Sequence, residues 1–457
     1  SITMGAKQSN MMLQNEKLLH YKFSLRERHN FDWLFGFSYT RDSQNRMNGR
    51  AKGAPSDYIH YAVDGMPSIK DLGGTLTAMQ SFVSDYYEKI MVSYFGRVAY
   101  NFDQKYLMEF TLRRDGSSVF GKDVRWATFP SVALGWNFSD EAFMKNFWWL
   151  NHGKLRGSWG TSGQVFQKAY LAQGVIDVGN EFLGVTGMVP AQLANTNLTW
   201  EKSEQYDLGL DVDLFDYRLK LKADYYYKYT KSMLWQVSLP GTVYMHQRQW
   251  QNAIECSNQG VELEAQIDIL RDTEIKWRAR FNISHNDNRL EKTYSGQDVD
   301  EKYVIGKSVY ELRAFKTDGY VQNIDEVPVY WDQNGNKVLL GDGGVVNSIR
   351  PGMKKIVDLN GDGRITDDDL YFAGSTLPVV YGGISSEIKW KQFDLSVLFN
   401  YSLGRHIINA FNKGSLNFSE TSLGAIFEDY RNVSKLKWHI IFLFHKSLPF
   451  SDRRLLL

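Results

Sequence analysis

One segment has the residue types and spacing of a calcium-binding loop. Residues 358–369 match the pattern D-x-[DN]-x-[DN]-G, with an acidic residue at the twelfth position. Calcium prefers oxygen ligands, which such a loop supplies from side chains, one backbone carbonyl and a closing carboxylate. Gly363 permits the sharp turn that the pattern requires. The expected ligands are Asp358, Asn360, Asp362, the Arg364 carbonyl, Thr366 and Asp369.

The flanking sequence differs from an EF-hand, so a second interpretation of the loop stays open. The closing Asp369 is shorter than the usual glutamate, which favours weaker, single-oxygen closure. Pro351 and Gly352 precede the loop and a strand is expected after it, so no helices flank it. The alternative is a solvated acidic Asx turn. A bound metal ion would stiffen a long surface loop.

Large aromatic residues in the predicted long loops form a second candidate site. Such side chains can stack on sugar rings or contact peptides, although ordinary loop packing would explain them equally well. No nucleophile elbow, catalytic acid pair, HExxH motif or phosphate-binding glycine loop is present in the sequence. We therefore predict neither an enzyme nor any cofactor besides calcium. The candidate residues for contact with a substrate or a capping protein are Trp235, Tyr244, Trp250 and Trp331.

The strongest structural signal is the alternation of two kinds of side chain along predicted strands. Residues 206–214 place Tyr206, Leu208 and Leu210 on one face, while Asp207 and Asp211 lie on the other. Residues 219–229 repeat the pattern with leucines and tyrosines opposite lysines. Side chains alternate across a strand, so one face of this hairpin is apolar and the other charged.

The alternation recurs in a series of predicted hairpins. Short segments within the hairpins alternate with long connections between them. The expected hairpins are 17–27 with 31–42, 92–102 with 106–114, 128–138 with 154–160, 206–214 with 219–229, 259–270 with 274–288, and 379–390 with 393–403. The connections between them are 43–91, 161–200, 231–258, 290–378 and 405–432. A thirteenth strand is expected near Val433, and a short helix through Phe143, Met144, Phe147 and Trp148. We predict an all-β fold: part of an antiparallel transmembrane β-barrel with about 12–13 strands, short periplasmic turns and long extracellular loops.

The charge of each side chain, and the face of the strand on which it lies, also predict the register of three hairpins. Apolar partners are expected to meet on one face and opposite charges on the other. A slip of one residue would place charges in lipid. The expected pairs are Leu214–Leu219, Asp213–Lys220 and Asp211–Lys222 in the fourth hairpin; Ile269–Ile275, Asp268–Lys276, Ile267–Trp277 and Glu264–Arg280 in the fifth; and Lys389–Asp394 and Ile388–Leu395 in the sixth. Aromatic residues near the strand ends, including Trp126, Phe129 and Trp136, are expected in the interfacial girdle.

Composition agrees with a β-barrel and argues against several other classes. The 457 residues carry a formal net charge of +1, so no electrostatic case for nucleic acid arises. One cysteine, Cys256, excludes an intrachain disulfide. No apolar run reaches the roughly 18 residues of a transmembrane helix. The first residues do not form a signal peptide, so we expect a fragment of a longer outer-membrane protein.

Several motifs resemble those of the SusC/RagA-type TonB-dependent transporters. They are residues 106–118, Arg125-Trp126, residues 129–136, 154–160, 197–202, Asp318-Gly-Tyr320 and 351–374. The resemblance spans about residue 15 to about residue 432. It implies that residues 1–433 are the C-terminal part of a barrel of about 22 strands with a plugged lumen. Residues 434–457 diverge from the family, and a frameshift or truncation would explain them.

The resemblance also implies a location, partners and an activity. Family members lie in the bacterial outer membrane and import oligosaccharides or peptides with a SusD-like surface lipoprotein. TonB supplies the energy through a segment ahead of the plug, and neither that segment, the plug nor a signal peptide is recognised in this chain. Two alternatives remain: a non-transporting outer-membrane barrel that acts as an adhesin or scaffold, and a soluble calcium-stabilised β-protein.

Overall fold

Strands dominate the part of the chain that the structure describes. The computed structural model describes residues 2–52, 69–70, 76–77, 80–166, 170–182, 185–239, 248–297, 303–320, 329–331, 337–339, 354–361 and 367–407. Its helical elements within these ranges are two 3₁₀ turns, η1 (Phe138–Asp140) and η3 (Asp367–Asp369). No helix in the described ranges is both long enough and apolar enough to cross a membrane.

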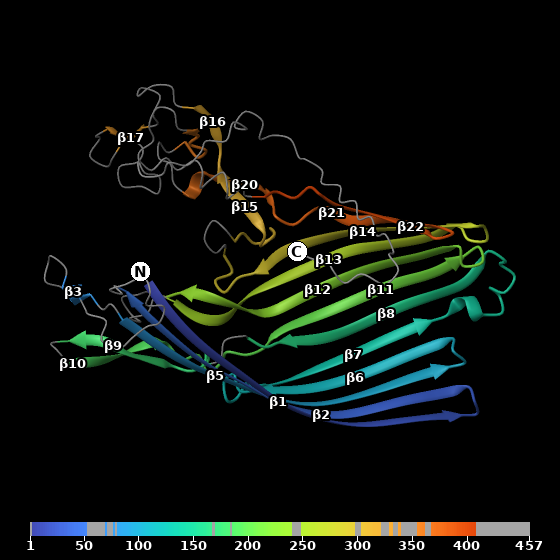
Figure 1. Cartoon of the computed structure of the whole chain (residues 1–457), viewed down its shortest axis with the longest axis horizontal. Coiled ribbons are helices and arrows are strands. Elements are labelled where there is room, and N and C mark those ends of the chain that lie inside the picture. Colours follow the sequence, from blue (N-terminus) through green and yellow to red (C-terminus); the bar gives the residue numbers. More distant parts are fainter. Residues whose placement is uncertain are drawn as a thin grey trace. The chain divides into compact units, whose positions relative to one another are not determined.

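Twelve strands join into one sheet in which the spatial order follows the chain order (Figure 1). The printed strand pairs are antiparallel, and the all-β prediction is confirmed. The expected thirteenth strand near Val433 lies outside the described residues. The strands are β1 (Ile2–Leu25), β2 (His29–Lys52), β5 (Gln80–Phe102), β6 (Tyr106–Ser117), β7 (Trp126–Trp136), β8 (Leu150–Gln164), β11 (Glu201–Leu214), β12 (Leu219–Ser238), β13 (Arg248–Leu270), β14 (Ile275–Lys292), β21 (Val380–Trp390) and β22 (Phe393–Leu403).

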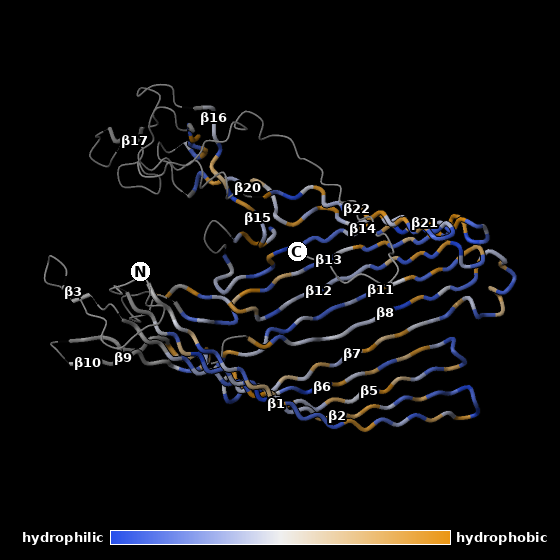
Figure 2. The backbone as a smooth tube through the Cα atoms, in the orientation of Figure 1, coloured by the Kyte–Doolittle hydropathy of each residue, from blue (hydrophilic) through white to orange (hydrophobic). Residues whose placement is uncertain are grey.

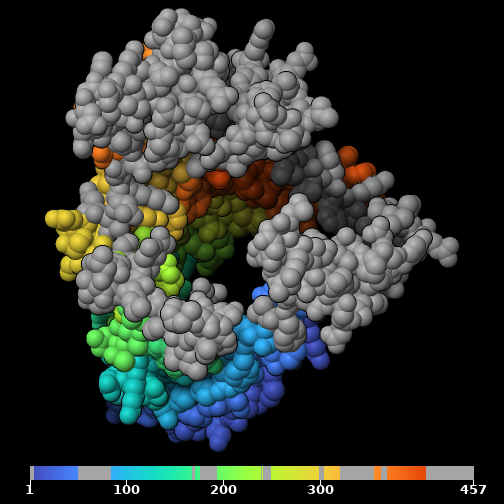
Figure 3. Space-filling model, turned by 90° about the vertical axis from the view of Figure 1, so that its left-hand side faces the viewer, coloured from blue at the N-terminus to red at the C-terminus, as the bar shows by residue number. Residues whose placement is uncertain are grey.

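Many strands are longer than the sequence predicted. β1 and β2 pair along their whole length of 24 residues, and Figure 3 shows their blue atoms side by side. A strand rises about 3.3 Å per residue, while the apolar band of a barrel is about 25 Å tall. The remaining length extends beyond that band, and in β1 it lacks the regular alternation that guided the prediction.

Small two-stranded sheets form inside the segments predicted as long loops. These segments contain no alternation long enough to indicate strands. They are β9 (Val175–Phe182) with β10 (Val185–Gln192), β15 (Glu311–Phe315) with β20 (Leu370–Ser375), β16 (Thr317–Tyr320) with β19 (Lys354–Ile356), β17 (Val329–Trp331) with β18 (Lys337–Leu339), and β3 (Ile69–Lys70) with β4 (Leu76–Thr77).

Tight turns connect the strands of each hairpin, and arginine–aspartate pairs join neighbouring turns. Asp103 accepts hydrogen bonds from Arg28 Nε at 2.7 and 3.0 Å, and the arginine lowers the pKa of Asp103 below its usual value. Arg218 Nη2 donates to Asp272 Oδ2 at 2.9 Å in the same manner. Each of these ion pairs therefore holds two neighbouring tight turns of its own unit together.

The predicted helix between β7 and β8 is wrong. Residues 138–150 form a series of turns in which every third amide, from Glu141 to Leu150, donates to the carbonyl three residues earlier. Apolar residues four apart suggested a helical face, but isolated helices of this length are marginal because nucleation is costly.

The registers test the charge argument, with one prediction confirmed and one corrected. In β21–β22 Lys389 pairs with Asp394 and Ile388 with Leu395, as predicted. In β13–β14 Asp268 instead pairs with Arg278 and Leu270 with Trp277, so Ile269 is an extra residue in a bulge. All four predicted pairs of this fifth hairpin are therefore wrong. From Cys256–Leu290 to Asp268–Arg278 the register differs from the predicted one by two residues, which keeps these side chains on their predicted faces.

The strands fall into two compact units. The first comprises Ser1–Leu134, Ser158–Glu204 and Thr230–Ala253, and contains the main cluster of buried apolar side chains. The second comprises Gly135–Gly157, Gln205–Tyr229 and Ile254–Leu457. Orange and blue residues alternate along strands of both units in Figure 2, as expected for a sheet with unlike faces.

Candidate functional site

The apolar face of the β11–β12 hairpin is exposed. Leu208 has 56% of its surface accessible, and Tyr206, Leu210, Leu221 and Tyr225 are also exposed. These side chains are therefore not buried against another layer of the described polypeptide. A soluble sandwich would bury such a face, whereas a transmembrane strand presents it to lipid. The structure thus agrees with the facing predicted from the sequence.

The opposite face of β8, β11 and β12 carries a network that we call the Arg156 cluster (Arg156, Asp211, Asp224 and Gly209). Arg156 Nε and Nη2 donate to the two carboxylate oxygens of Asp211 at 2.8 and 3.0 Å, and Nη2 also donates to Asp224 at 2.8 Å. All three side chains are partly exposed. Two carboxylates around one guanidinium leave a net negative, hydrated group on this face.

Gly209 makes room for the Arg156 cluster. A Cβ atom added there would lie 2.4 Å from Asp224 Oδ1 and 2.6 Å from Arg156 Cζ. Replacing Gly209 with valine should displace the guanidinium and lower the free energy of unfolding by about 1–3 kcal/mol, as overpacking does. Denaturant unfolding in detergent micelles measures the loss. Gly157→Ala is the matched control because an added Cβ there meets nothing within 4 Å; equal losses in both variants would contradict this account.

Ion pairs continue across the polar face of β13, β14 and β21. Arg280 donates to Gln266 at 3.0 Å and to Glu387 at 2.7 Å, so it connects three adjacent strands. Arg278 donates to Asp268 at 2.6 Å in the corrected register. The bulge thus places Asp268 opposite an arginine, and charge pairing is retained despite the shift.

A similar network lies on β1, β2 and β5 in the first unit. Asp32 is 2.6 Å from His20 Nε2, 3.3 Å from Lys22 Nζ and 3.6 Å from Arg97 Nη2. Arg97 also lies 3.9 Å from Glu109 on β6. Exposed pairs contribute little to stability, about 0–1 kcal/mol each. Their recurrence indicates instead that this face is in contact with water.

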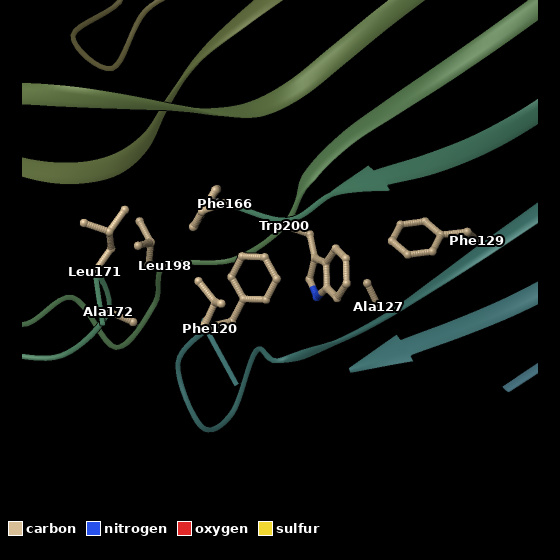
Figure 4. Packing of buried hydrophobic residues seen from close by; sticks show 9 residues of the cluster. Phe120, Ala127, Phe129, Phe166, Leu171, Ala172, Leu198 and Trp200 are labelled. Carbon is tan, nitrogen blue, oxygen red and sulfur yellow. The ribbon is translucent and has the colours of Figure 1, made fainter. Parts of the chain in front are cut away.

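Buried apolar side chains gather where the long connections meet the strands, and we call them the Trp200 cluster. Its members are Val119, Phe120, Ala127, Phe129, Phe166, Leu171, Ala172, Leu198 and Trp200. Trp200 is 1% exposed and lies between Phe120 and Phe129, with ring centroids 4.7 and 5.5 Å away (Figure 4). This packing fixes the segments around residues 119, 171 and 198 against the ends of β7 and β8.

Hydrogen bonds fix the same segments. The indole Nε1 of Trp200 donates to the Arg125 carbonyl at 3.0 Å. The Asn252 amide accepts from Thr199 N and donates to the Thr199 carbonyl, each at 2.9 Å, and it also donates to the Ser232 carbonyl at 2.7 Å. The start of β11 is therefore held to β13 by side chains as well as by packing.

The structure places three of the four aromatic residues predicted to contact a substrate on strands. Trp235 lies in β12 and Trp250 in β13, so their placement in a long loop is wrong, because both strands continue past the predicted ends. Trp250 packs against the Trp200 cluster. Trp331 is the last residue of β17, and Tyr244 lies outside the described residues. Substrate contact by these four residues stays a prediction.

Of the three aromatic residues on β7 that were expected in the girdle, Phe129 is elsewhere, while the girdle position of Trp126 and Trp136 stays a prediction. Trp126 is exposed, with its ring centroid 6.2 Å from that of Tyr94. Phe129 is buried in the Trp200 cluster, because its odd separation from Trp126 places it on the other face. Its predicted membrane-interface position is therefore wrong.

Part of the calcium-like loop lies within the described residues. Asp369 is fully buried, and its Oδ1 accepts hydrogen bonds from Leu359 N at 2.8 Å and Asn360 N at 3.4 Å. Asp358 Oδ1 accepts from Gly361 N, three residues later, at 2.7 Å, so this side chain bonds to the backbone of its own loop. No group of three acidic, histidine or cysteine side chains comes together among the residues described. The expected ligands Asp362, Arg364 and Thr366 lie outside them, so calcium binding stays a prediction.

The sequence did not single out Arg156 or Trp200 as functional candidates. Arg156 stands among apolar neighbours in Leu155-Arg156-Gly157, which indicates a polar face but not its partners 55 and 68 residues away. Trp200 belongs to a motif used for the family resemblance, but nothing local predicts that it is buried.

Comparisons with known proteins agree with this geometry. A family model described as "TonB dependent receptor-like, beta-barrel" matches residues 5–352. TonB-dependent receptor P3 of Formosa agariphila is 34% identical over 393 residues, which cover 83% of this chain and 38% of that protein. TonB-dependent receptor SusC of Bacteroides thetaiotaomicron is 32% identical over 348 residues, which cover 73% of this chain and 33% of SusC.

A solved structure gives the same result for the fold. The RagAB peptide importer in its closed-closed state superposes with a TM-score of 0.68 at 25% identity, over 88% of this chain and 42% of that one. The chain spans less than half the length of each of these relatives. The family is one of transporters and not of enzymes, as predicted, and its members are integral outer-membrane proteins. The chain belongs to the TonB-dependent receptor β-barrel family, in its SusC/RagA type, and lies in the outer membrane.

Proposed function

We propose that this chain is part of a transporter that imports oligosaccharides or peptides across the outer membrane with energy from TonB. The observation that carries the proposal is the pairing of an exposed apolar face with an ion-paired, hydrated face on the same strands of a TonB-dependent receptor. The hydrated face would line the aqueous path. One similar structure is that of a peptide importer, which supports the peptide class. The oligosaccharide class rests on the resemblance of the sequence motifs to the SusC/RagA-type transporters.

We further propose that a SusD-like surface lipoprotein caps the long-connection end. The Trp200 cluster supports this because it holds several connections in fixed positions, and rigid surfaces bind partners at lower entropic cost. TonB would act through a segment ahead of the plug domain, as the family resemblance implies.

Uptake by a deletion strain tests the proposed import. Loss of the gene should abolish growth on the substrate oligosaccharide or peptide, and growth should return with the wild-type gene. A panel of single glycans and defined peptides, supplied as sole carbon or nitrogen sources, identifies the class. Normal growth of the deletion strain on every member would contradict the proposal.

The connection between β14 and β21 should carry the contact with substrate or lipoprotein. Deleting residues 294–378 and joining the strands with a short turn should abolish co-purification of the lipoprotein or binding of the substrate. The strands should still insert, because β14 and β21 pair directly from Ile275–Trp390 to Ser284–Tyr381. Outer-membrane fractionation measures insertion, and unchanged binding would count against the assignment.

We also propose that calcium binds the 358–369 loop. The buried Asp369 supports this, because its position fits the closing carboxylate of such a loop. Calorimetric titration of the intact protein with calcium should detect binding. The Asp358→Asn variant should bind calcium more weakly. Asp272→Asn, in a turn far along the chain, is the control. Absence of any calcium-dependent heat would leave the Asx turn as the explanation.

A further inference from the structure

The connection between β7 and β8 carries an exposed aromatic surface at the tight-turn end. Trp148 is 81% exposed, the most exposed large apolar side chain among the described residues, and Phe143 is 62% exposed. Phe147 and Trp149 are also exposed, and their ring centroids are 5.6 Å apart. Exposed large aromatic side chains gathered in one short segment mark a surface that contacts a partner or a membrane. We call residues 137–149 the β7–β8 connection.

The connection starts on the apolar face of the sheet. A Cβ atom added to Gly153 would lie 2.4 Å from the ring of Phe138, so that ring covers the side to which Gly153 points. Leu155, two residues later, points to the same side and is exposed, whereas Arg156 points to the other. The ring of Trp136 lies 5.9 Å from that of Phe138. The connection therefore continues the face that the family presents to lipid.

The rest of the connection is fastened to the next tight turn. Trp149 O accepts a hydrogen bond from Phe215 N at 2.9 Å, and the Asn151 side chain accepts one from Tyr217 N at 3.1 Å. The rings of Trp148 and Phe215 have centroids 6.3 Å apart. Trp148 is thus held in place while most of its surface stays uncovered.

We propose that the β7–β8 connection is an anchor in the headgroup region of the periplasmic leaflet, and that its occupant is phospholipid. Short turns of outer-membrane barrels lie on the periplasmic side. Tryptophan prefers the boundary between headgroups and acyl chains, because its ring is apolar and its N–H is polar. The aromatic surface continues the lipid-facing side of β8, so the lipid layer that covers Leu155 extends to it.

Nitroxide accessibility in a bilayer tests the anchor, with the intact protein in nanodiscs of phosphatidylethanolamine and phosphatidylglycerol. A spin label replaces Trp148 (W148C) or Phe143 (F143C) in a Cys256→Ala background. Glu274→Cys provides the control, because Glu274 is an exposed polar residue in the β13–β14 turn. Collision rates with oxygen, which is enriched in lipid, and with a water-soluble nickel chelate are compared at each position.

The ratio of oxygen to nickel accessibility should be several-fold higher at positions 143 and 148 than at position 274. A ratio equal to the control would show that the patch faces water and would overturn the proposal. Protection from both reagents would also overturn it, because protein rather than lipid would then cover the patch. The result does not depend on the imported substrate, so it stands or falls separately from the proposed transport.

Discussion

Replacing Leu210 with arginine is expected to block assembly of the protein in the outer membrane. Leu210 is exposed on the apolar face of β11, between Gly209 and Asp211 on the charged face. An arginine facing lipid near the bilayer midplane costs about 2–4 kcal/mol, a large part of the stability of most proteins. Fractionation and protease resistance of whole cells measure the amount assembled.

The control places the same side chain one residue further along the strand. Asp211→Arg faces water, so it should disturb the pairing with Arg156 and leave assembly in the membrane intact. The two substituted residues are adjacent in the sequence, but their side chains point to opposite faces of the strand. If the membrane tolerated both equally, the assigned faces would be wrong.

Replacing Trp200 with alanine is expected to give the largest loss of stability in the first unit. Trp200 is almost fully buried between two phenylalanines, and truncation of a buried aromatic side chain costs about 3–5 kcal/mol. Its hydrogen bond to the Arg125 carbonyl would also be lost. Urea unfolding in detergent micelles measures the change, and trypsin cleavage after Lys122 or Arg125 should become faster.

Trp200→Phe separates packing from hydrogen bonding. It keeps most of the ring contact and loses the N–H donor, which contributes about 0.5–1.5 kcal/mol. We expect this variant to lie between the wild type and Trp200→Ala in both assays. A loss below about 1 kcal/mol for the alanine variant, well under the range for buried aromatics, would show that the cluster does not hold the connections.

The strands could be predicted because the sequence pattern that indicates a strand lies within the strand itself. Alternation along 206–214 is visible within nine residues, and the tight turns at 103–105 and 391–392 were placed correctly from the residues around them. The two faces of β11 followed from the same alternation. Even the wrong register of β13–β14 kept the correct faces along most of the hairpin, because the observed pairing differs from the predicted one by two residues there.

The contacts that build the site could not be predicted, because they join distant residues. Arg156 meets Asp211 and Asp224 only through the order of β8, β11 and β12 and through the space left by Gly209. The burial of Phe129 and Trp200 depends on connections that contain no periodic signal. The helix expected at 143–148 failed for a related reason: four apolar residues with helical spacing also fit a series of turns.

Labelling along β11 in intact outer membranes tests the central claim that one face of each strand meets lipid and the other water. Single cysteines at each position from 206 to 214, in the Cys256→Ala background, would be treated with a membrane-impermeant maleimide. The account predicts reaction at Asp207, Gly209, Asp211 and Asp213, and protection at the alternate positions that begin with Tyr206. Uniform reactivity along the strand, or protection of the odd positions with reaction at the even ones, would contradict it.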